Sequence, residues 1–149
     1  MNNLKEKKLN NKGFSLVELI IVIAIMAVLI GVLAPQYLKY VEKSRVSADA
    51  DQIDTLISAV EIYSAENGIV EGTIEIKNDG TIKPTGTVGD GAAGNVTVIG
   101  ALEDAGLDYT KVKVSSKTFK DGAATITFGT TGVKVSEPKT AAALGRATS

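Results

Sequence analysis

An uninterrupted apolar stretch near the N-terminus sets the strongest limit on what this chain can fold into. Residues Leu19 to Leu38 carry no charged side chain, and residues 19–34 are apolar on every helical face. A helix of about 20 apolar residues, rising 1.5 Å per residue, spans the roughly 30 Å hydrocarbon core of a bilayer. Helices of soluble domains usually keep one polar face. The sequence therefore predicts a membrane-spanning helix.

Basic residues flank this stretch on both sides. Four lysines precede it against one acid, and three basic residues follow it: Lys5, Lys7, Lys8 and Lys12 against Glu6, then Lys39, Lys43 and Arg45. This count favours a cytoplasmic N-terminus, though only by four to three. A secretory signal peptide cut after Ala34 is one alternative, but Pro35 would then follow the cut and the run exceeds a usual signal core. An uncleaved signal anchor is another.

The residues just before the stretch form a motif. They read Lys12-Gly13-Phe14-Ser15-Leu16-Val17-Glu18-Leu19. A short basic leader, glycine, an aromatic residue and then one acid four residues later resemble the prepilin signature of the type IV pilin family. The resemblance is strong from about Lys12 to Gly68. It implies that a membrane-embedded prepilin peptidase cuts between Gly13 and Phe14 on the cytoplasmic face and N-methylates Phe14.

Glu18 is an ionisable group at the edge of an apolar helix, where a charge is costly unless it is paired. The resemblance implies that the Glu18 carboxylate of one subunit meets the new Phe14 amine of a neighbour during filament assembly. Glu18 also lies four residues after Phe14, so its carboxylate can approach the amine of its own chain. A third reading is that Glu18 reaches the lipid headgroups. The sequence leaves these alternatives open.

Helical character is expected from Phe14 to about Glu66, with Asn67-Gly68 as the stop signal. Within it, Pro35 cannot donate to the carbonyl of Gly31, and glycine itself disfavours the helix, so Gly31 to Pro35 is a weak point where we expect a kink. The resemblance implies unwinding there in a filament; a static kink is the alternative. After Lys39 an amphipathic face begins: Val46, Ala50, Ile53, Ile57, Val60 and Tyr63.

Beyond Gly68 the composition shifts to Gly, Thr, Val and Lys, and short alternating runs predict β-strands. These runs are residues 73–77, 96–99, 109–115, 123–128 and 132–136, with hairpin turns at 120–122 and 129–132 and one helical turn at 101–105. We expect the last three strands to form an antiparallel meander, and residues 141–149 a loose tail. The expected fold class is α+β, with an antiparallel sheet packed on the distal half of the long helix.

The residue inventory excludes much chemistry. With no cysteine, no histidine and a net charge of −1, the chain lacks thiolate and imidazole sites and has no strong polyanion affinity. We expect no catalytic residue, metal or cofactor. Gly89 to Gly94 matches a dinucleotide motif without its strand and helix, and Lys43, Ser44 and Ser47 are adjacent without a pocket. Lys111, Lys113, Lys117 and Lys120 offer a weak DNA-binding alternative, which edge-strand protection explains more simply.

Three segments are expected: a leader (1–13), a long helix (14–67, apolar to 38 and amphipathic from 39) and a β-rich head (68–149). The resemblance implies a structural filament subunit, not an enzyme, that serves adhesion, motility or DNA uptake. Its implied partners are copies of itself, the prepilin peptidase, the membrane, and the assembly platform with its ATPase. It would pass from the cytoplasmic membrane to an extracellular filament. A pseudopilin of a secretion or competence system is the alternative, mildly disfavoured by Ile69-Val70 after Asn67-Gly68.

Overall fold

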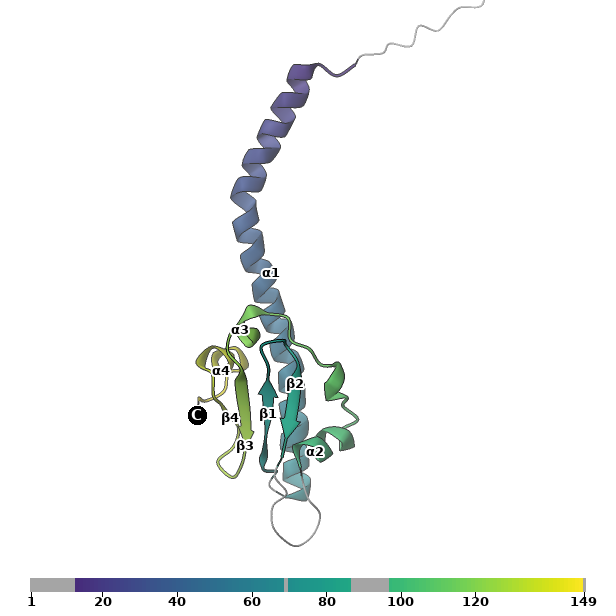
Figure 1. The fold of residues 1–149 in the computed structure, drawn as a ribbon, viewed down its shortest axis with the longest axis vertical. Coiled ribbons are helices and arrows are strands. Elements are labelled where there is room, and N and C mark those ends of the chain that lie inside the picture. Colours follow the sequence, from purple (N-terminus) through teal and green to yellow (C-terminus); the bar gives the residue numbers. More distant parts are fainter. Residues whose placement is uncertain (1–12, 69, 87–96, 149) are drawn as a thin grey trace, which may run out of the picture. The chain divides into compact units, whose positions relative to one another are not determined.

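The computed structural model describes residues 13–68, 70–86 and 97–148 (Figure 1). The chain divides into two units, Met1–Lys39 and Tyr40–Ser149, and each is described by itself. The leader residues 1–12, the glycine-rich run 89–94 and residue 96 of the predicted strand at 96–99 lie outside the described residues.

Helix α1, Leu16–Asn67, is the first element, and it confirms the predicted long helix to within two residues at either end. Its last turn is closed by the Asn67 side-chain amide, which donates to the carbonyl of Tyr63 at 3.3 Å. Gly68 follows with a φ of 103°, a left-handed conformation that glycine adopts without strain and that ends the helix. In the first unit, no described side chain is buried.

The second unit holds a four-stranded antiparallel sheet (Figure 1). Its strands are β1 (Gly72–Ile76), β2 (Ile82–Thr85), β3 (Ala124–Phe128) and β4 (Lys134–Val135), in the spatial order β2-β1-β3-β4. The central pair, β1 and β3, is in register with Ile74 opposite Ile126. These observations confirm the α+β fold class and the strands predicted at 73–77 and 123–128.

One core joins the sheet to the Tyr40–Asn67 part of α1. On α1, Ile53, Ile57 and Val60 are fully or almost fully buried, which confirms the predicted amphipathic face. The sheet contributes Ile74 and Ile126 to the same cluster. The alternation of buried and less buried residues along β1 and β3 gives the sheet one apolar face, and α1 supplies the partner that this face needs.

The connection from β2 to β3 corrects two predictions, because it contains helices rather than strands. The elements are α2 (Val98–Asp104), the 3₁₀ helix η1 (Tyr109–Lys111) and α3 (Lys117–Lys120). The predicted strand at 96–99 is wrong because Thr97 caps α2, its Oγ1 accepting the Gly100 N–H at 3.0 Å. The strand at 109–115 is wrong because Asp108 accepts the Thr110 N–H and starts η1; only an isolated bridge from Lys113 remains.

The predicted meander of the last three strands is also wrong. Strand β3 pairs with β1 and β4, so the turn at 120–122 forms no hairpin and follows α3. The hairpin at 129–132 is confirmed, with the Gly132 N–H donating to the Gly129 carbonyl at 2.9 Å between β3 and a β4 of two residues. Strand β2 was not predicted because it contains Pro84, which a strand tolerates at a sheet edge.

Residues 141–149 are no loose tail where the structure describes them. Helix α4 spans Pro138–Leu144, with Pro138 in its first turn and Gly145 at its left-handed end. Ala141 and Leu144 are buried in the core. Beyond the helix, Ala147 accepts a backbone hydrogen bond from Val135 of β4 at 3.1 Å. The outer edge of β4 is therefore covered by the chain itself.

Candidate processing and assembly site

The predicted cleavage position lies ahead of α1. Gly13 and Phe14 are outside the helix, which begins at Leu16. The Phe14 side chain is 91% exposed, and no atom approaches within 4 Å of where a Cβ on Gly13 would stand. The bond between Gly13 and Phe14 thus lies in chain without regular secondary structure, next to an almost fully exposed Phe14 side chain.

Glu18 caps the start of its own helix. Its Oε2 accepts the backbone N–H of Ser15 at 2.8 Å, and the Leu19 N–H donates to the Ser15 carbonyl at 3.2 Å. This is half of a capping box, in which an acid at the third helical position reaches back to the N-cap. The Ser-x-x-Glu spacing of Ser15 and Glu18 is the sequence signal for this cap. The Ser15 N–H is thus a further partner for Glu18, beside the two amines and the lipid headgroups considered above.

The apolar stretch meets the requirements for a membrane span. Helix α1 is the one helix among the described residues that is long and apolar enough to cross a bilayer, with a mean hydropathy of 3.1 in its most apolar 18-residue window and none of that window buried. Large apolar side chains of this stretch are more than half exposed, for example Leu29 at 54% and Val32 at 63%. Apolar surface on this scale requires a bilayer or other protein around it.

Gly31 and Pro35 lie in this stretch, inside α1. A Cβ at Gly31 would meet nothing within 4 Å, so the glycine leaves its helix face open. Ala27, one turn earlier, places a second small side chain on the same face of the helix. Such a small-xxx-small pair lets another helix approach closely.

Asp49 is a buried carboxylate whose structural role the sequence did not reveal. It is 2% exposed, and its oxygens accept the backbone N–H groups of Ser115 at 2.9 Å and Ser116 at 2.6 Å. A buried carboxylate is tolerated when it is hydrogen-bonded in this way. On the same helix Glu42 accepts the Lys117 N–H at 2.6 Å. Since the partners lie 66 to 75 residues away, no local pattern predicts these contacts.

A second long-range contact involves Arg146. Its Nη1 donates to Glu61 Oε1 at 2.7 Å, and its Nη2 lies 3.9 Å from Asp54 Oδ1. The hydrogen bond to Glu61 raises the pKa of the Arg146 guanidinium above its ordinary value, with further support from the negative charges of Glu61 and Asp54. The end of the described chain is thereby held against α1.

The residues considered for other chemistry do not come together. Among the described residues, no group of three or more His, Cys, Asp or Glu side chains is placed to hold a metal ion. Lys43, Ser44 and Ser47 lie exposed on α1. The four lysines of the DNA-binding alternative do not share a strand, since Lys111 ends η1 and pairs with Asp108 at 2.9 Å, whereas Lys117 and Lys120 belong to α3.

Comparison with known proteins agrees with the N-terminal geometry. Residues 8–34 match the family model of the prokaryotic N-terminal methylation motif. A fimbrial protein of Pseudomonas aeruginosa is 38% identical over 74 residues, covering 50% of this chain and 44% of that protein. The prepilin peptidase-dependent protein A of Clostridium perfringens is 30% identical over 102 residues, covering 68% and 65%. The type IV major fimbrial protein FimA of Dichelobacter nodosus is 31% identical, covering 52% and 58%.

The chain spans about half the length of the curated relatives that it matches. No solved structure matches significantly. A membrane-length helix behind a methylation motif, followed by an antiparallel sheet, defines a pilin-like class of protein. The motif and the relatives support a type IV pilin family for this chain.

Proposed function

We propose that this chain is the structural subunit of a type IV pilus, processed at its N-terminus and polymerised into an extracellular filament. The observation that carries the proposal is the first part of α1, up to Lys39, which directly follows the Gly13-Phe14 bond, contains Glu18 and has an apolar stretch with no buried residue. An apolar helix of this length needs a bilayer before assembly and a bundle of like helices after it. The subunit itself performs no catalysis.

The proposed processing begins in the cytoplasmic membrane, with the leader on the cytoplasmic side. Prepilin peptidase cuts between Gly13 and Phe14 and methylates the new amine. The exposure of Phe14 and the lack of regular secondary structure around it support access by such an enzyme. An assembly platform and its ATPase then move the subunit into the filament. The filament would serve adhesion, motility or DNA uptake.

Glu18 has a proposed role in this transfer. Cleavage turns the Phe14 amide into a cationic amine, a stronger partner for a carboxylate than the neutral N–H of Ser15. We infer that the Glu18 carboxylate leaves its cap and pairs with the Phe14 amine of a neighbouring subunit. The pairing removes two uncompensated charges from an apolar environment.

Mass spectrometry of sheared cell-surface filaments tests the processing. The expected mature protein lacks residues 1–13 and carries a methylated Phe14. An intact N-terminus, or a cut after Ala34, would overturn the proposal.

Two substitutions at Glu18 separate its charge from its cap. Glu18→Ala removes both, and we expect cleaved subunits that form no filaments. Glu18→Gln keeps an oxygen for the Ser15 N–H, because glutamine also serves in capping boxes, but it removes the charge. If charge pairing drives assembly, the glutamine variant also forms no filaments. Normal filaments from Glu18→Gln would show that the cap, not the charge, matters.

The segment from Gly31 to Pro35 has a proposed role in flexibility. Within α1 it combines a missing hydrogen-bond donor with the residue of lowest helix propensity after proline. We propose that α1 kinks or unwinds there when subunits pack. Hydrogen exchange of the full chain in detergent would show faster exchange at residues 31–35 than at 21–25. Equal protection would contradict this.

A further inference from the structure

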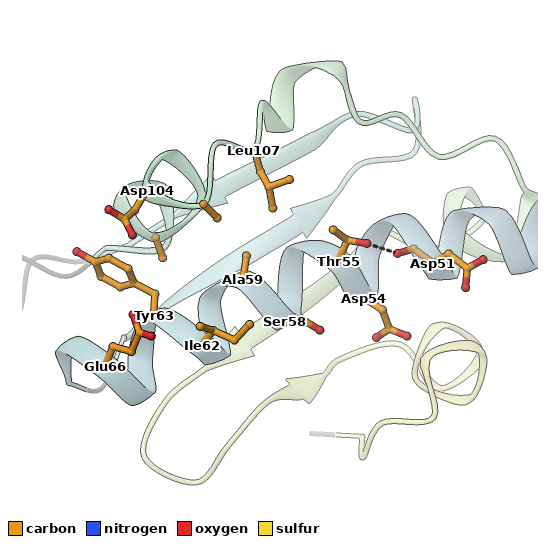
Figure 2. A pocket seen from close by; sticks show the side chains of 12 residues that line it. Asp51, Asp54, Thr55, Ser58, Ala59, Ile62, Tyr63, Glu66, Asp104 and Leu107 are labelled. Carbon is orange, nitrogen blue, oxygen red and sulfur yellow. Dashed lines mark hydrogen bonds between the residues drawn. The ribbon is translucent and has the colours of Figure 1, made fainter.

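A groove opens between α1 and α2 in the second unit, with a volume of about 700 Å³ (Figure 2). Ala59, Ile62 and Leu107 contribute apolar surface to it. Ile62 is 61% exposed, an unusual state for a large aliphatic side chain in a folded unit whose core is otherwise covered. The groove therefore offers an apolar contact that the described part of the chain does not fill.

The rim of the groove is acidic. Asp51, Asp54, Glu66 and Asp104 all border it, as Figure 2 shows. Asp54 lies near Arg146, but among the described residues Asp51, Glu66 and Asp104 make no salt bridge. An occupant of matching chemistry would carry an exposed apolar side chain with basic residues beside it.

The same unit carries a segment of that description at the start of its helix. Among the described residues of Tyr40–Ser149, two large apolar or aromatic side chains are exposed, and these are Tyr40, at 72%, and Ile62. Tyr40 is followed by Lys43 and Arg45, both exposed and both without a salt bridge to a described residue. The two uncovered apolar positions are thus flanked by opposite charges.

A single shift of one copy along α1 brings both the apolar pair and the charged pair together between two copies. Tyr40 and Ile62 are 22 residues apart on one helix, and Lys43 and Glu66 are 23 apart. At 1.5 Å per residue these separations are about 33 and 35 Å. If a second copy runs parallel and is shifted along the helix by that amount, its Tyr40 meets Ile62 while its Lys43 meets Glu66.

We propose that the groove is a polymerisation surface, and that its occupant is the segment Tyr40–Arg45 of a second copy of this chain. The contact joins two different surfaces of the same molecule. Such a heterologous contact leaves a free Tyr40–Arg45 segment at one end of the assembly and a free groove at the other, so it generates an open filament rather than a closed dimer. The inference rests on the proposed pilin function and assigns to it a contact outside the apolar part of α1.

Cysteine cross-linking tests the contact, because the chain contains no cysteine of its own. Tyr40→Cys and Ile62→Cys are introduced together into the full chain, and sheared filaments are oxidised and separated without reductant. Within one molecule the two positions are about 33 Å apart, whereas a disulfide needs Cα atoms within about 7 Å. Any disulfide is therefore between molecules, and the proposal predicts a ladder of covalent multimers.

Matched controls define the specificity. Each single cysteine variant should yield no ladder. The pair Tyr40→Cys with Thr130→Cys, which places the second thiol on the exposed β3–β4 turn, should also yield none. A ladder from this control pair would overturn the assignment.

Charge exchange gives a second readout. Lys43→Glu should lower the filament yield several-fold, and adding Glu66→Lys should restore it. Lys83→Glu on the exposed edge strand β2 should leave the yield unchanged. Filaments without a ladder and without a Lys43 effect would overturn the groove assignment while the pilin proposal stands. Failure of the unmodified chain to form filaments would defeat the pilin proposal itself.

Discussion

The two lengths of α1 on either side of residue 39 share one secondary structure but differ in what surrounds them. From Leu16 to Lys39 no described side chain is buried. From Tyr40 to Asn67 six are buried: Asp49, Ala50, Ile53, Leu56, Ile57 and Val60. Most helix stability in proteins comes from packing an apolar face. The second length receives that packing from its own chain, whereas the first requires lipid or other subunits.

The largest expected effect is a difference in unfolding free energy between two matched substitutions, one in each part of α1. Ile57→Ala removes a fully buried side chain from the core and should lower the free energy of unfolding by about 2–5 kcal/mol. Ile23→Ala makes the same chemical change where the side chain is 57% exposed, and it should cost under about 0.5 kcal/mol. Urea unfolding of the full chain in detergent, followed by tyrosine fluorescence, measures both. Similar values would break the comparison.

A second effect comes from the buried carboxylate. Asp49→Asn retains the size of the side chain but replaces a charged acceptor with an amide whose NH₂ group cannot accept from Ser115 and Ser116. Hydrogen bonds to charged groups contribute about 1.5–3 kcal/mol, so a loss in that range is expected in the same urea titration. Asp51→Asn, at an exposed neighbouring position, is the control and should be nearly silent.

Two glycines of the second unit should differ by a smaller amount in what their replacement by alanine costs in stability. Gly80 has a φ of 84°, and a Cβ there would stand 2.3 Å from the Val114 carbonyl oxygen. Gly132 has a φ of 91°, and a Cβ there would meet nothing within 4 Å. Gly80→Ala should therefore cost about 1–3 kcal/mol more than Gly132→Ala, which carries the backbone strain alone. Thermal melts followed by circular dichroism would show the difference, and equal melting temperatures would contradict the close approach.

The smallest effect is a pH dependence. Hydrogen bonds from the Thr110 and Lys111 side chains hold the pKa of Asp108 below its ordinary value of 3.8. A lowered folded-state pKa contributes stability above pH 3.8, and this contribution is lost as the pH falls through the folded-state value. Asp108→Asn should remove this part of the acid sensitivity, most visibly in urea midpoints measured between about pH 2 and 5. If the urea midpoints fall with pH in the same way in Asp108→Asn and in the unmodified chain, the η1 cap is not formed in solution.

The sequence predicts the parts of the fold whose signals are local and repeated. The face containing Ile53, Ile57 and Val60 follows helical spacing over several turns, and the apolar stretch is continuous, so both were found. The strand at 124–128 likewise alternates through Ala124, Ile126 and Phe128. Each of these patterns is long enough to outweigh the propensity of any single residue.

The errors occur where one hydrogen bond decides the local structure. Val98 and Ile99 are typical strand residues, yet the cap from Thr97 turns them into the start of α2. Helix α4 was missed although Pro138 and Gly145 mark its two ends, because its few apolar residues are mostly alanine. The pairing of β1 with β3 depends on a long connection, and no local pattern specifies it.

The sequence predicted which residues form the candidate site, but not the contacts that they make. The motif identifies Gly13, Phe14 and Glu18, and the structure adds the Ser15 cap, whose Ser-x-x-Glu signal was present in the sequence. Asp49 and the groove depend on segments 35 or more residues apart, so they appear only once the fold is known.

The Arg146 contact has a consequence for how the second unit would bear load. Because the chain has no cysteine, no covalent bond closes its C-terminal region, and the guanidinium of Arg146 on Glu61 serves as a latch. Ionic contacts that reach solvent weaken as salt screens them. Tension applied at the C-terminus would open this latch without breaking a bond, and the latch would close again when the tension is released.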